Sequence, residues 1–369
     1  MSIKYWEYEE EENNNKWSNN NIKIEKNDEL NENKFYPWIK PNSKCHSLRG
    51  MLKLHYEIMD FYHFIQLNDE EKELRNITFN DIKNIIEENF PDYTCELYGS
   101  FKTGLSLPNS DIDILVLPKE VIMDENNIDT NIKNNGKSLY NSLKKIYNIF
   151  LEINNEFNSL EIINAKVPII KCIYKKTNIH VDISIFKENA ALVVKDIDKL
   201  TNINPEIKPL MLIIKYTLRQ RGLNEKYKGG VSSFILFSLL YYYLNDIKKR
   251  IEYKTKNRKK ERIGTLGSLL LGFFNFYGFD FNYQKLGISI RNGGFLFKRT
   301  DESKHLLCLE NFQDSSEDMG KNCYQFQNVV NIFKFAKQRL ESHDLQVESY
   351  LKGFIFPDTI LRERAMKYK

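Results

Sequence analysis

Two aspartates carry the clearest chemistry in this sequence. Asp111 and Asp113 stand two residues apart in the apolar run DIDILVL. Successive side chains of a β-strand point to opposite faces, so this spacing predicts both carboxylates on one face of a strand over 112–117. Two carboxylates on one face suit Mg²⁺ when substrate phosphates complete its shell. A lone D-x-D is also typical of solvated residues at a strand edge.

A Gly-Ser pair lies about one loop before these aspartates. Gly99 and Ser100 follow a predicted strand over 95–98 and precede a predicted helical turn. Backbone N–H groups at such a turn can bind a triphosphate, and the Ser100 hydroxyl adds one donor. The pair is a weak signal alone, but together with the aspartates it predicts a phosphate site next to a metal site.

A third carboxylate, Asp182, lies in the predicted strand over 179–186. Apolar residues occupy every second position there, so Asp182 shares the other face with His180 and Ser184. It is either a surface carboxylate or the third ligand of a two-metal site. In such a site one ion lowers the pKa of the attacking hydroxyl and the other stabilises the leaving pyrophosphate.

Three residues further along the chain suit contacts with a nucleotide. Lys215 lies in the polar stripe of a predicted helix over 209–221 and could reach a β- or γ-phosphate. Ser233 and Phe234 follow a pair of glycines, and Phe234 could stack on a base. A surface lysine and a core phenylalanine would produce the same pattern.

The elements that position these residues change character along the chain. A mixed α and β stretch follows an early helix, and a mainly helical stretch comes after it. The predicted strands are 95–98, 112–117, 167–174 and 179–186. The predicted helices are 48–65, 80–89, 138–150, 209–221, 232–244, 266–277 and 327–341.

Composition sets limits on the class of protein. The five cysteines are scattered and never spaced as C-x-x-C, which argues against a disulfide framework and a zinc site. The longest apolar stretch, 234–244, is too short to span a bilayer, and the first residues lack the apolar core of a secretory signal. We therefore expect a soluble, intracellular protein without a membrane partner. Residues 1–36 are rich in Glu, Asn and Lys, which predicts a disordered tail.

The densest basic stretch, residues 248–262, is a candidate for contact with RNA phosphates. The formal net charge of the chain is only +4, so the place of the charge matters more than its sum. The stretch could instead be a nuclear localisation signal or a solvated loop that joins two helices. Its candidate RNA-binding residues are Lys248, Lys249, Arg250, Arg258, Lys259 and Lys260.

Several motifs together resemble one known family. The motifs are LYGSFKTGLSLPNSDIDILV, KVPIIK, VDIS, QRGLNE, KGGVSSF, GSLLLGFFNFYGFDFNY, IRNGG and LCLENFQDSSEDMGKNCY. They resemble those of the non-canonical poly(A) polymerases of the Trf/PAPD type, within the DNA-polymerase-β-like nucleotidyltransferase superfamily. The resemblance extends from about Pro37 to near the C-terminus.

The resemblance implies a role for each candidate residue. The three aspartates would bind catalytic Mg²⁺ or Mn²⁺, and the other residues would bind the substrate ATP. The predicted catalytic metal ligands are Asp111, Asp113 and Asp182, and the predicted nucleotide-binding residues are Gly99, Ser100, Asn189, Lys215, Ser233, Phe234, Glu317 and Asp318.

The choice of base depends on the loop that contains Glu317 and Asp318. In the family an acidic group there can favour the adenine amino group, and relatives that transfer uridylate tend to use a histidine. No histidine occurs from 306 to 342, which favours ATP. Two departures stand out. Phe234 replaces a frequent tyrosine, and Asn311 and Phe312 replace a usual Asp–Pro.

The resemblance also implies the fold and the biology. We expect an α+β protein with a palm-like nucleotidyltransferase domain over 78–190 and a mixed sheet. A mainly helical central (PAP-associated) domain is expected over 37–77 and 191–365. The implied activity is template-independent transfer of AMP from ATP to an RNA 3′-hydroxyl, in nuclear RNA surveillance and decay. Implied partners are a zinc-knuckle RNA-binding protein and an exosome-linked helicase in a TRAMP-like complex. A terminal uridylyltransferase, an inactive nucleotidyltransferase scaffold and a cytoplasmic location stay open as alternatives.

Overall fold

The computed structural model describes the chain from Tyr36 to Lys367 with internal gaps. The described residues are 36–119, 136–164, 168–185, 197, 199–254, 264–299, 305–312, 314–342 and 347–367. The predicted tail over 1–36 therefore lies outside the described residues apart from Tyr36. No helix in these ranges is long and apolar enough to cross a membrane.

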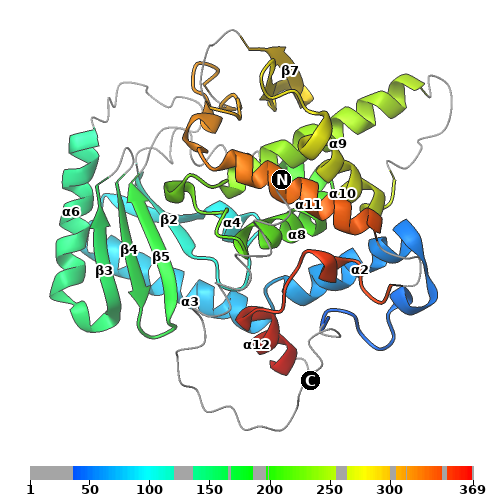
Figure 1. Ribbon diagram of the computed structural model, residues 1–369. Helices are drawn as coiled ribbons and strands as arrows, with labels where there is room; N and C mark the ends of the chain where they lie inside the picture. The colour runs from blue at the N-terminus through cyan, green and yellow to red at the C-terminus, as the bar shows by residue number, and fades with distance from the viewer. Residues whose placement is uncertain are drawn as a thin grey trace. The chain divides into compact units, whose positions relative to one another are not determined.

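A five-stranded mixed sheet forms the first part of the fold (Figure 1). Its strands are β1 (Tyr93–Tyr98), β2 (Ile112–Pro118), β3 (Phe157–Ile163), β4 (Ile169–Tyr174) and β5 (Ile179–Ile185). The strand order is β1-β2-β5-β4-β3, with β2 and β5 parallel and the other neighbours antiparallel. The predicted strands near 95–98, 112–117, 167–174 and 179–186 are confirmed as β1, β2, β4 and β5.

The register of the sheet separates an apolar row from a polar row. Ile114, Ile183 and Ile170 are aligned across β2, β5 and β4, and all three are fully buried. Helices α3 (Asp69–Asn89) and α6 (Gly136–Glu152) supply apolar side chains to the same core. Figure 1 shows α6 alongside β3 and β4. Side chains one position away along each strand point to the opposite face, where the polar row lies.

Two elements of this part were missed or shortened in the prediction. Helix α3 begins at Asp69 rather than near residue 80, because Asn68 and Glu71 form a reciprocal capping box at its start. The charged sequence of its first turns hides the helical period. Strand β3 was not predicted, because it is an edge strand whose side chains are mostly exposed or half-buried.

The second part of the fold is mainly helical, as predicted. Its helices are α2 (Gly50–Ile65), α8 (Ile207–Arg219), α9 (Ser233–Lys254), α10 (Leu266–Asn275), α11 (Phe326–Ser342) and α12 (Thr359–Lys367). Helix α2 packs against α8 and α10. Gly267 permits the close approach of α10, because a Cβ there would lie 2.5 Å from the Met51 carbonyl oxygen.

This stretch is not wholly helical. A hairpin of β6 (Leu286–Ser289) and β7 (Phe295–Lys298) lies between α10 and α11, and the prediction did not include it. Helix α9 runs ten residues beyond the predicted end at 244, so the first part of the basic stretch is helical rather than a loop. The predicted domain limits at 78–190, 37–77 and 191–365 stay a prediction.

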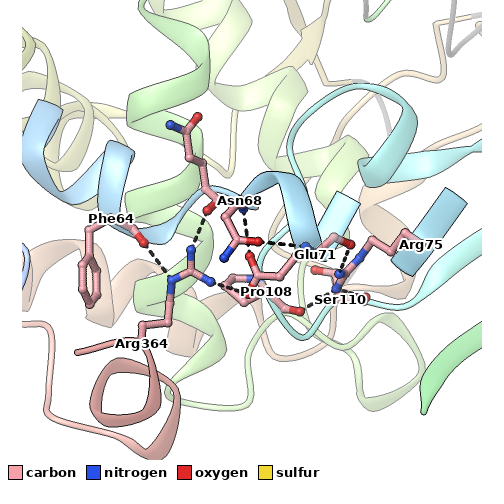
Figure 2. Close-up of polar contacts among 8 residues, drawn as sticks. Phe64, Asn68, Glu71, Arg75, Pro108, Ser110 and Arg364 are labelled. Atoms are coloured by element: carbon pink, nitrogen blue, oxygen red, sulfur yellow. Dashed lines mark hydrogen bonds and ion pairs between the residues drawn. The ribbon is translucent and has the colours of Figure 1, made fainter. Parts of the chain in front are cut away.

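The C-terminal helix is tied to the start of α3 through one buried arginine (Figure 2). Arg364 of α12 donates hydrogen bonds to the carbonyl oxygens of Phe64 and Gln66, at 2.7 Å each. It also forms an ion pair with Glu71 at 2.6 Å. The ends of α2, α3 and α12 are thereby held together by charge-assisted hydrogen bonds.

Candidate active site

A row of four polar side chains crosses the sheet. Tyr98, Asp113, Asp182 and Lys171 are aligned in register on β1, β2, β5 and β4, so they share one face. Asp111 directly precedes β2, and its carboxylate lies 3.9 Å from the Lys171 ammonium. The structure therefore brings together the three aspartates that the sequence singled out.

The carboxylates impose a strong electrostatic constraint on one another. The pKa of Asp113 is raised to about 7 by burial together with the neighbouring charges of Asp182 and Asp111. Burial also raises the pKa of Asp182, although Lys171 opposes that shift. Three neighbouring carboxylates suit a divalent cation, because a cation would offset the repulsion that raises the pKa of Asp113 and Asp182.

Lys171 partly fills that need in the described structure. Its ammonium lies 3.1 Å from Asp182 Oδ1, and its pKa is raised by these carboxylates despite partial burial. Within the described ranges, no three His, Cys, Asp or Glu side chains are already arranged to hold a metal. The carboxylate donors nevertheless suit a metal ion, which would replace contacts that Lys171 makes.

Gly99 fits closely against the carboxylate row. Its φ is +68°, and a Cβ there would lie 2.1 Å from Asp113 Oδ2. No side chain can occupy this position without displacing the carboxylate. Ser100 follows in the short helix α4 (Gly99–Lys102), and both residues are half-buried. The Gly-Ser turn and the aspartates thus form one continuous site.

Lys215 lies in the interior rather than in a polar stripe. Helix α8 is buried all round from Pro209 to Leu218, so the predicted polar stripe that contains Lys215 does not face solvent. The Lys215 ammonium donates a hydrogen bond to the Leu105 carbonyl oxygen at 2.9 Å. Burial lowers its pKa to about 8, an effect that the Asp113 charge partly offsets. A buried cation is costly unless it is paired or hydrogen-bonded, and the Leu105 carbonyl oxygen is one such partner of Lys215.

Ser233 and Phe234 stand at the first turn of α9 and are half-buried. Ser232 precedes them, and its hydroxyl accepts a hydrogen bond from the Ile235 N–H. Phe234 is therefore not a fully buried core residue. Both side chains are partly accessible to a ligand, while their roles stay predictions.

The acidic pair of the loop before α11 is engaged within the protein. Asp318 accepts hydrogen bonds from the N–H groups of Leu309 and Gly320, and it lies 2.5 Å from His305 Nε2. Glu317 accepts a hydrogen bond from the Asn311 side chain at 2.7 Å. Asp318 thus fixes the loop. The sequence prediction did not include His305, because this residue directly precedes the histidine-free stretch 306–342.

Three of the six candidate RNA-binding cations have internal partners. Lys248 contacts the Asn204 side chain, Lys249 contacts the Gly294 carbonyl oxygen at 2.5 Å, and Arg250 pairs with Asp246 at 2.7 Å. These contacts orient the end of α9. The other three cations, Arg258, Lys259 and Lys260, lie outside the described residues. The nucleotide-binding candidate Asn189 also lies outside them.

One arginine supports the loop that leads into the carboxylate row (Figure 2). Arg75 of α3 donates hydrogen bonds to the carbonyl oxygens of Pro108, at 2.5 Å, and Ser110, at 3.4 Å. Asp111 follows Ser110 directly. The sequence offered no signal for Arg75, because its partners lie more than thirty residues away.

Lys171 was also missed, although a signal existed. It lies in KVPIIK, where the two-residue period of a strand would place it on the face opposite Ile170. Only the pairing of β4 with β5 reveals that this face holds Asp182.

Two family models match parts of this chain. Residues 54–193 match "Poly(A) RNA polymerase, mitochondrial-like, central palm domain". Residues 265–325 match "Cid1 family poly A polymerase". The first match contains the sheet and the three aspartates, and the second contains α10 and the loop before α11.

Curated relatives match most of the chain. It is 31% identical over 315 residues to Poly(A) RNA polymerase protein 1 of Saccharomyces cerevisiae, covering 83% of this chain and 46% of the relative. It is 29% identical over 321 residues to Poly(A) RNA polymerase gld-4 of Caenorhabditis elegans, covering 83% and 35%. It is 27% identical to the inactive poly(A) RNA polymerase protein Trf4-2 of Drosophila melanogaster, covering 85% and 74%. The chain spans half or less of the length of the first two relatives.

Solved structures agree with the family matches. The polymerase core of TRAMP, an RNA surveillance complex, superposes with a TM-score of 0.71 and 26% identity, covering 87% of this chain and 99% of that one. A Cid1 poly(U) polymerase superposes with a TM-score of 0.66 and 20% identity, covering 83% and 99%, a likeness that shows the fold alone. The predicted α+β class, with a palm-like nucleotidyltransferase sheet and a helical part, is confirmed.

Proposed function

The chain belongs to the Trf/Cid1-type family of poly(A) polymerases, and we propose that it adds adenylates to RNA 3′ ends without a template. The observation that carries the proposal is the row of carboxylates with Gly99 against Asp113. The chain retains all three aspartates, which argues against the inactive scaffold despite its similarity to a relative named as inactive.

The proposed reaction is an in-line displacement. The RNA 3′-hydroxyl gives up its proton to solvent, and its oxygen forms a bond to the α-phosphorus of ATP while the bond to the bridging oxygen breaks and pyrophosphate leaves. Asp111, Asp113 and Asp182 would hold Mg²⁺ or Mn²⁺, which would lower the pKa of the attacking hydroxyl and neutralise charge on the phosphates.

The residues of the chain would orient the triphosphate. The Gly99–Ser100 backbone borders Asp113, so it can bind phosphate oxygens beside the metal ligands. Lys215 would exchange its hydrogen bond to the Leu105 carbonyl for a phosphate oxygen. Phe234 would stack on the base from the first turn of α9. Positioning and charge neutralisation would supply most of the rate.

ATP is the proposed substrate, with UTP as the second candidate. The similarity to relatives named as poly(A) RNA polymerases supports ATP as the substrate. The pairing of His305 with Asp318 favours UTP as the alternative, because it places a histidine on the predicted base-recognition loop. We further propose a nuclear role in RNA surveillance with a zinc-knuckle protein and an exosome-linked helicase; the similarity to the polymerase core of TRAMP, an RNA surveillance complex, supports the surveillance role.

Extension of a labelled RNA primer with each of the four nucleotides tests the proposal. We expect tails with ATP and Mg²⁺ or Mn²⁺, and no extension by Asp111→Ala. Asp69→Ala is the matched control, because Asp69 is a fully exposed aspartate at the start of α3. A preference for UTP would overturn the adenylate assignment, and silence with every nucleotide would overturn the proposed activity.

A further inference from the structure

An exposed tyrosine stands beside the carboxylate row without belonging to the core. Tyr227 is 72% exposed, and the Lys171 ammonium lies 6.0 Å from the centre of its ring. The same ammonium lies 3.1 Å from Asp182 Oδ1. Lys171 thus lies between the Tyr227 ring and Asp182, the third catalytic aspartate, yet most of the ring surface faces solvent. The Tyr227 side chain forms a hydrogen bond with Glu225 of the same turn, and the ring stays largely exposed.

The turn that carries Tyr227 is well fixed. Gly229, at φ +78°, and Gly230 close the turn through N–H donation to the carbonyl oxygens of Lys226 and Glu225. From the loop before α11, Gln325 donates its backbone N–H to the Gly229 carbonyl at 3.0 Å and its side-chain amide to the Lys228 carbonyl at 2.6 Å. The ring is thus presented by a preorganised turn, which lowers the entropic cost of binding.

A cation accompanies the ring on the same turn. The Lys228 ammonium lies 5.7 Å from the ring centre and 2.7 Å from Glu225. Its side chain is more than half exposed, so it can move to a phosphate without loss of packing. An aromatic ring with an adjacent lysine is the usual combination in sites that bind single-stranded nucleic acid, where bases stack and cations follow the backbone.

The geometry of an in-line displacement indicates which substrate binds beside Tyr227. Gly99 and Lys215, the residues proposed to bind the triphosphate, lie on the β1 and α8 side of Asp113. Lys171 and Tyr227 lie on the opposite side, beyond Asp182. In an in-line displacement the attacking oxygen and the leaving pyrophosphate are on opposite sides of the α-phosphorus. If the triphosphate binds on the Gly99 side, the RNA 3′ end enters from the side of Tyr227.

We infer that Tyr227 is a stacking surface for one of the last two bases at the RNA 3′ end, with Lys228 beside the adjoining phosphate. The inference rests on the proposed function and adds a residue that positions the RNA primer. Its ligand is single-stranded RNA of any sequence, because every base offers a face for stacking.

A binding cycle tests the inference independently of catalysis. Fluorescence anisotropy would compare a single-stranded RNA with versions that lack the base at either of the last two positions or at an upstream position. We expect Tyr227→Ala to weaken binding of the intact RNA about tenfold. The wild type should bind one of the two terminal abasic RNAs more weakly than the intact RNA. Tyr227→Ala should bind these two RNAs with the same affinity. Tyr227→Phe should bind like the wild type.

Phe279→Ala supplies the matched control. Phe279 is another half-exposed aromatic residue with two lysines near its ring, Lys334 at 5.7 Å and Lys337 at 5.0 Å. It should leave RNA affinity unchanged. If Tyr227→Ala weakens the binding of terminal and upstream abasic RNAs by the same factor, the inference is overturned. A loss of affinity no larger than that caused by Phe279→Ala would also overturn it.

Primer extension separates a failure of the inference from a failure of the proposed function. With ATP present, Tyr227→Ala should raise the KM for the primer about tenfold and leave the KM for ATP unchanged. Extension by the wild type with no change in Tyr227→Ala would overturn the inference alone. No RNA binding and no extension by the wild type would overturn both.

Discussion

The two sides of the carboxylate row differ in burial, and the difference corresponds to their proposed substrates. On one side Lys215 is buried and its ammonium is fixed on the Leu105 carbonyl, while Gly99 leaves no space for a side chain. On the other side Lys171 is partly exposed and Tyr227 is largely exposed. A triphosphate is the same in every cycle and suits a buried, closely fitted site, whereas RNA 3′ ends vary and suit an exposed one.

The largest effect should come from Gly99→Ala on the buried side. The new methyl group would collide with Asp113 Oδ2, and displacement of this carboxylate should lower kcat at least about a hundredfold in primer extension. Gly104→Ala is the matched control, because Gly104 also has a positive φ, of +70°, but a Cβ there meets no atom closer than 3.4 Å. The control should lose about 1–2 kcal/mol of stability through backbone strain. Similar activity of the two variants would contradict the close fit of Gly99 and Asp113.

A pH-dependent effect should follow from Lys215. Its pKa is lowered to about 8 by burial, so the side chain loses its charge as the pH rises from 7 to 9. The KM for ATP should increase over this range in the wild type, because a neutral amine binds phosphate weakly. Lys215→Met should have a high KM for ATP at pH 7 and no such increase. A steep pH dependence in the variant would show that another group is responsible.

The smallest effect should come from Lys171 on the open side. Its ion pair with Asp182 compensates part of the carboxylate repulsion, and both side chains are partly exposed. Lys171→Met should therefore lower the free energy of unfolding without metal by only about 1 kcal/mol. Added Mn²⁺ should raise the melting temperature of the variant more than that of the wild type. An equal rise in both proteins would contradict the exchange of lysine for metal.

The sequence was most informative where the signal is local. The two-residue spacing of Asp111 and Asp113 and the alternation around Asp182 predicted their strands and shared face, and the structure brings the three together. The family resemblance is confirmed by the matching models. These features need only the period of a strand and a short motif.

Features that depend on contacts between distant segments could not be predicted. Lys171 faces Asp182 only through the register of β4 on β5, and Tyr227 reaches Lys171 only through the packing of the turn before α9. Lys215 was placed on a polar stripe because a single helix cannot reveal that α8 is covered on every side. The contact of Asp318 with the nucleotide stays a prediction, whereas its hydrogen bonds to Leu309 and Gly320 depend on loop closure, which the sequence does not reveal.

One kinetic comparison tests the division of the site most directly. The KM values for ATP and for the RNA primer would be measured for Lys215→Met and Tyr227→Ala in the same extension assay. We expect Lys215→Met to raise the KM for ATP and Tyr227→Ala to raise the KM for the primer, each with little effect on the other substrate. If both variants raise the same KM, the buried and open sides do not bind different substrates.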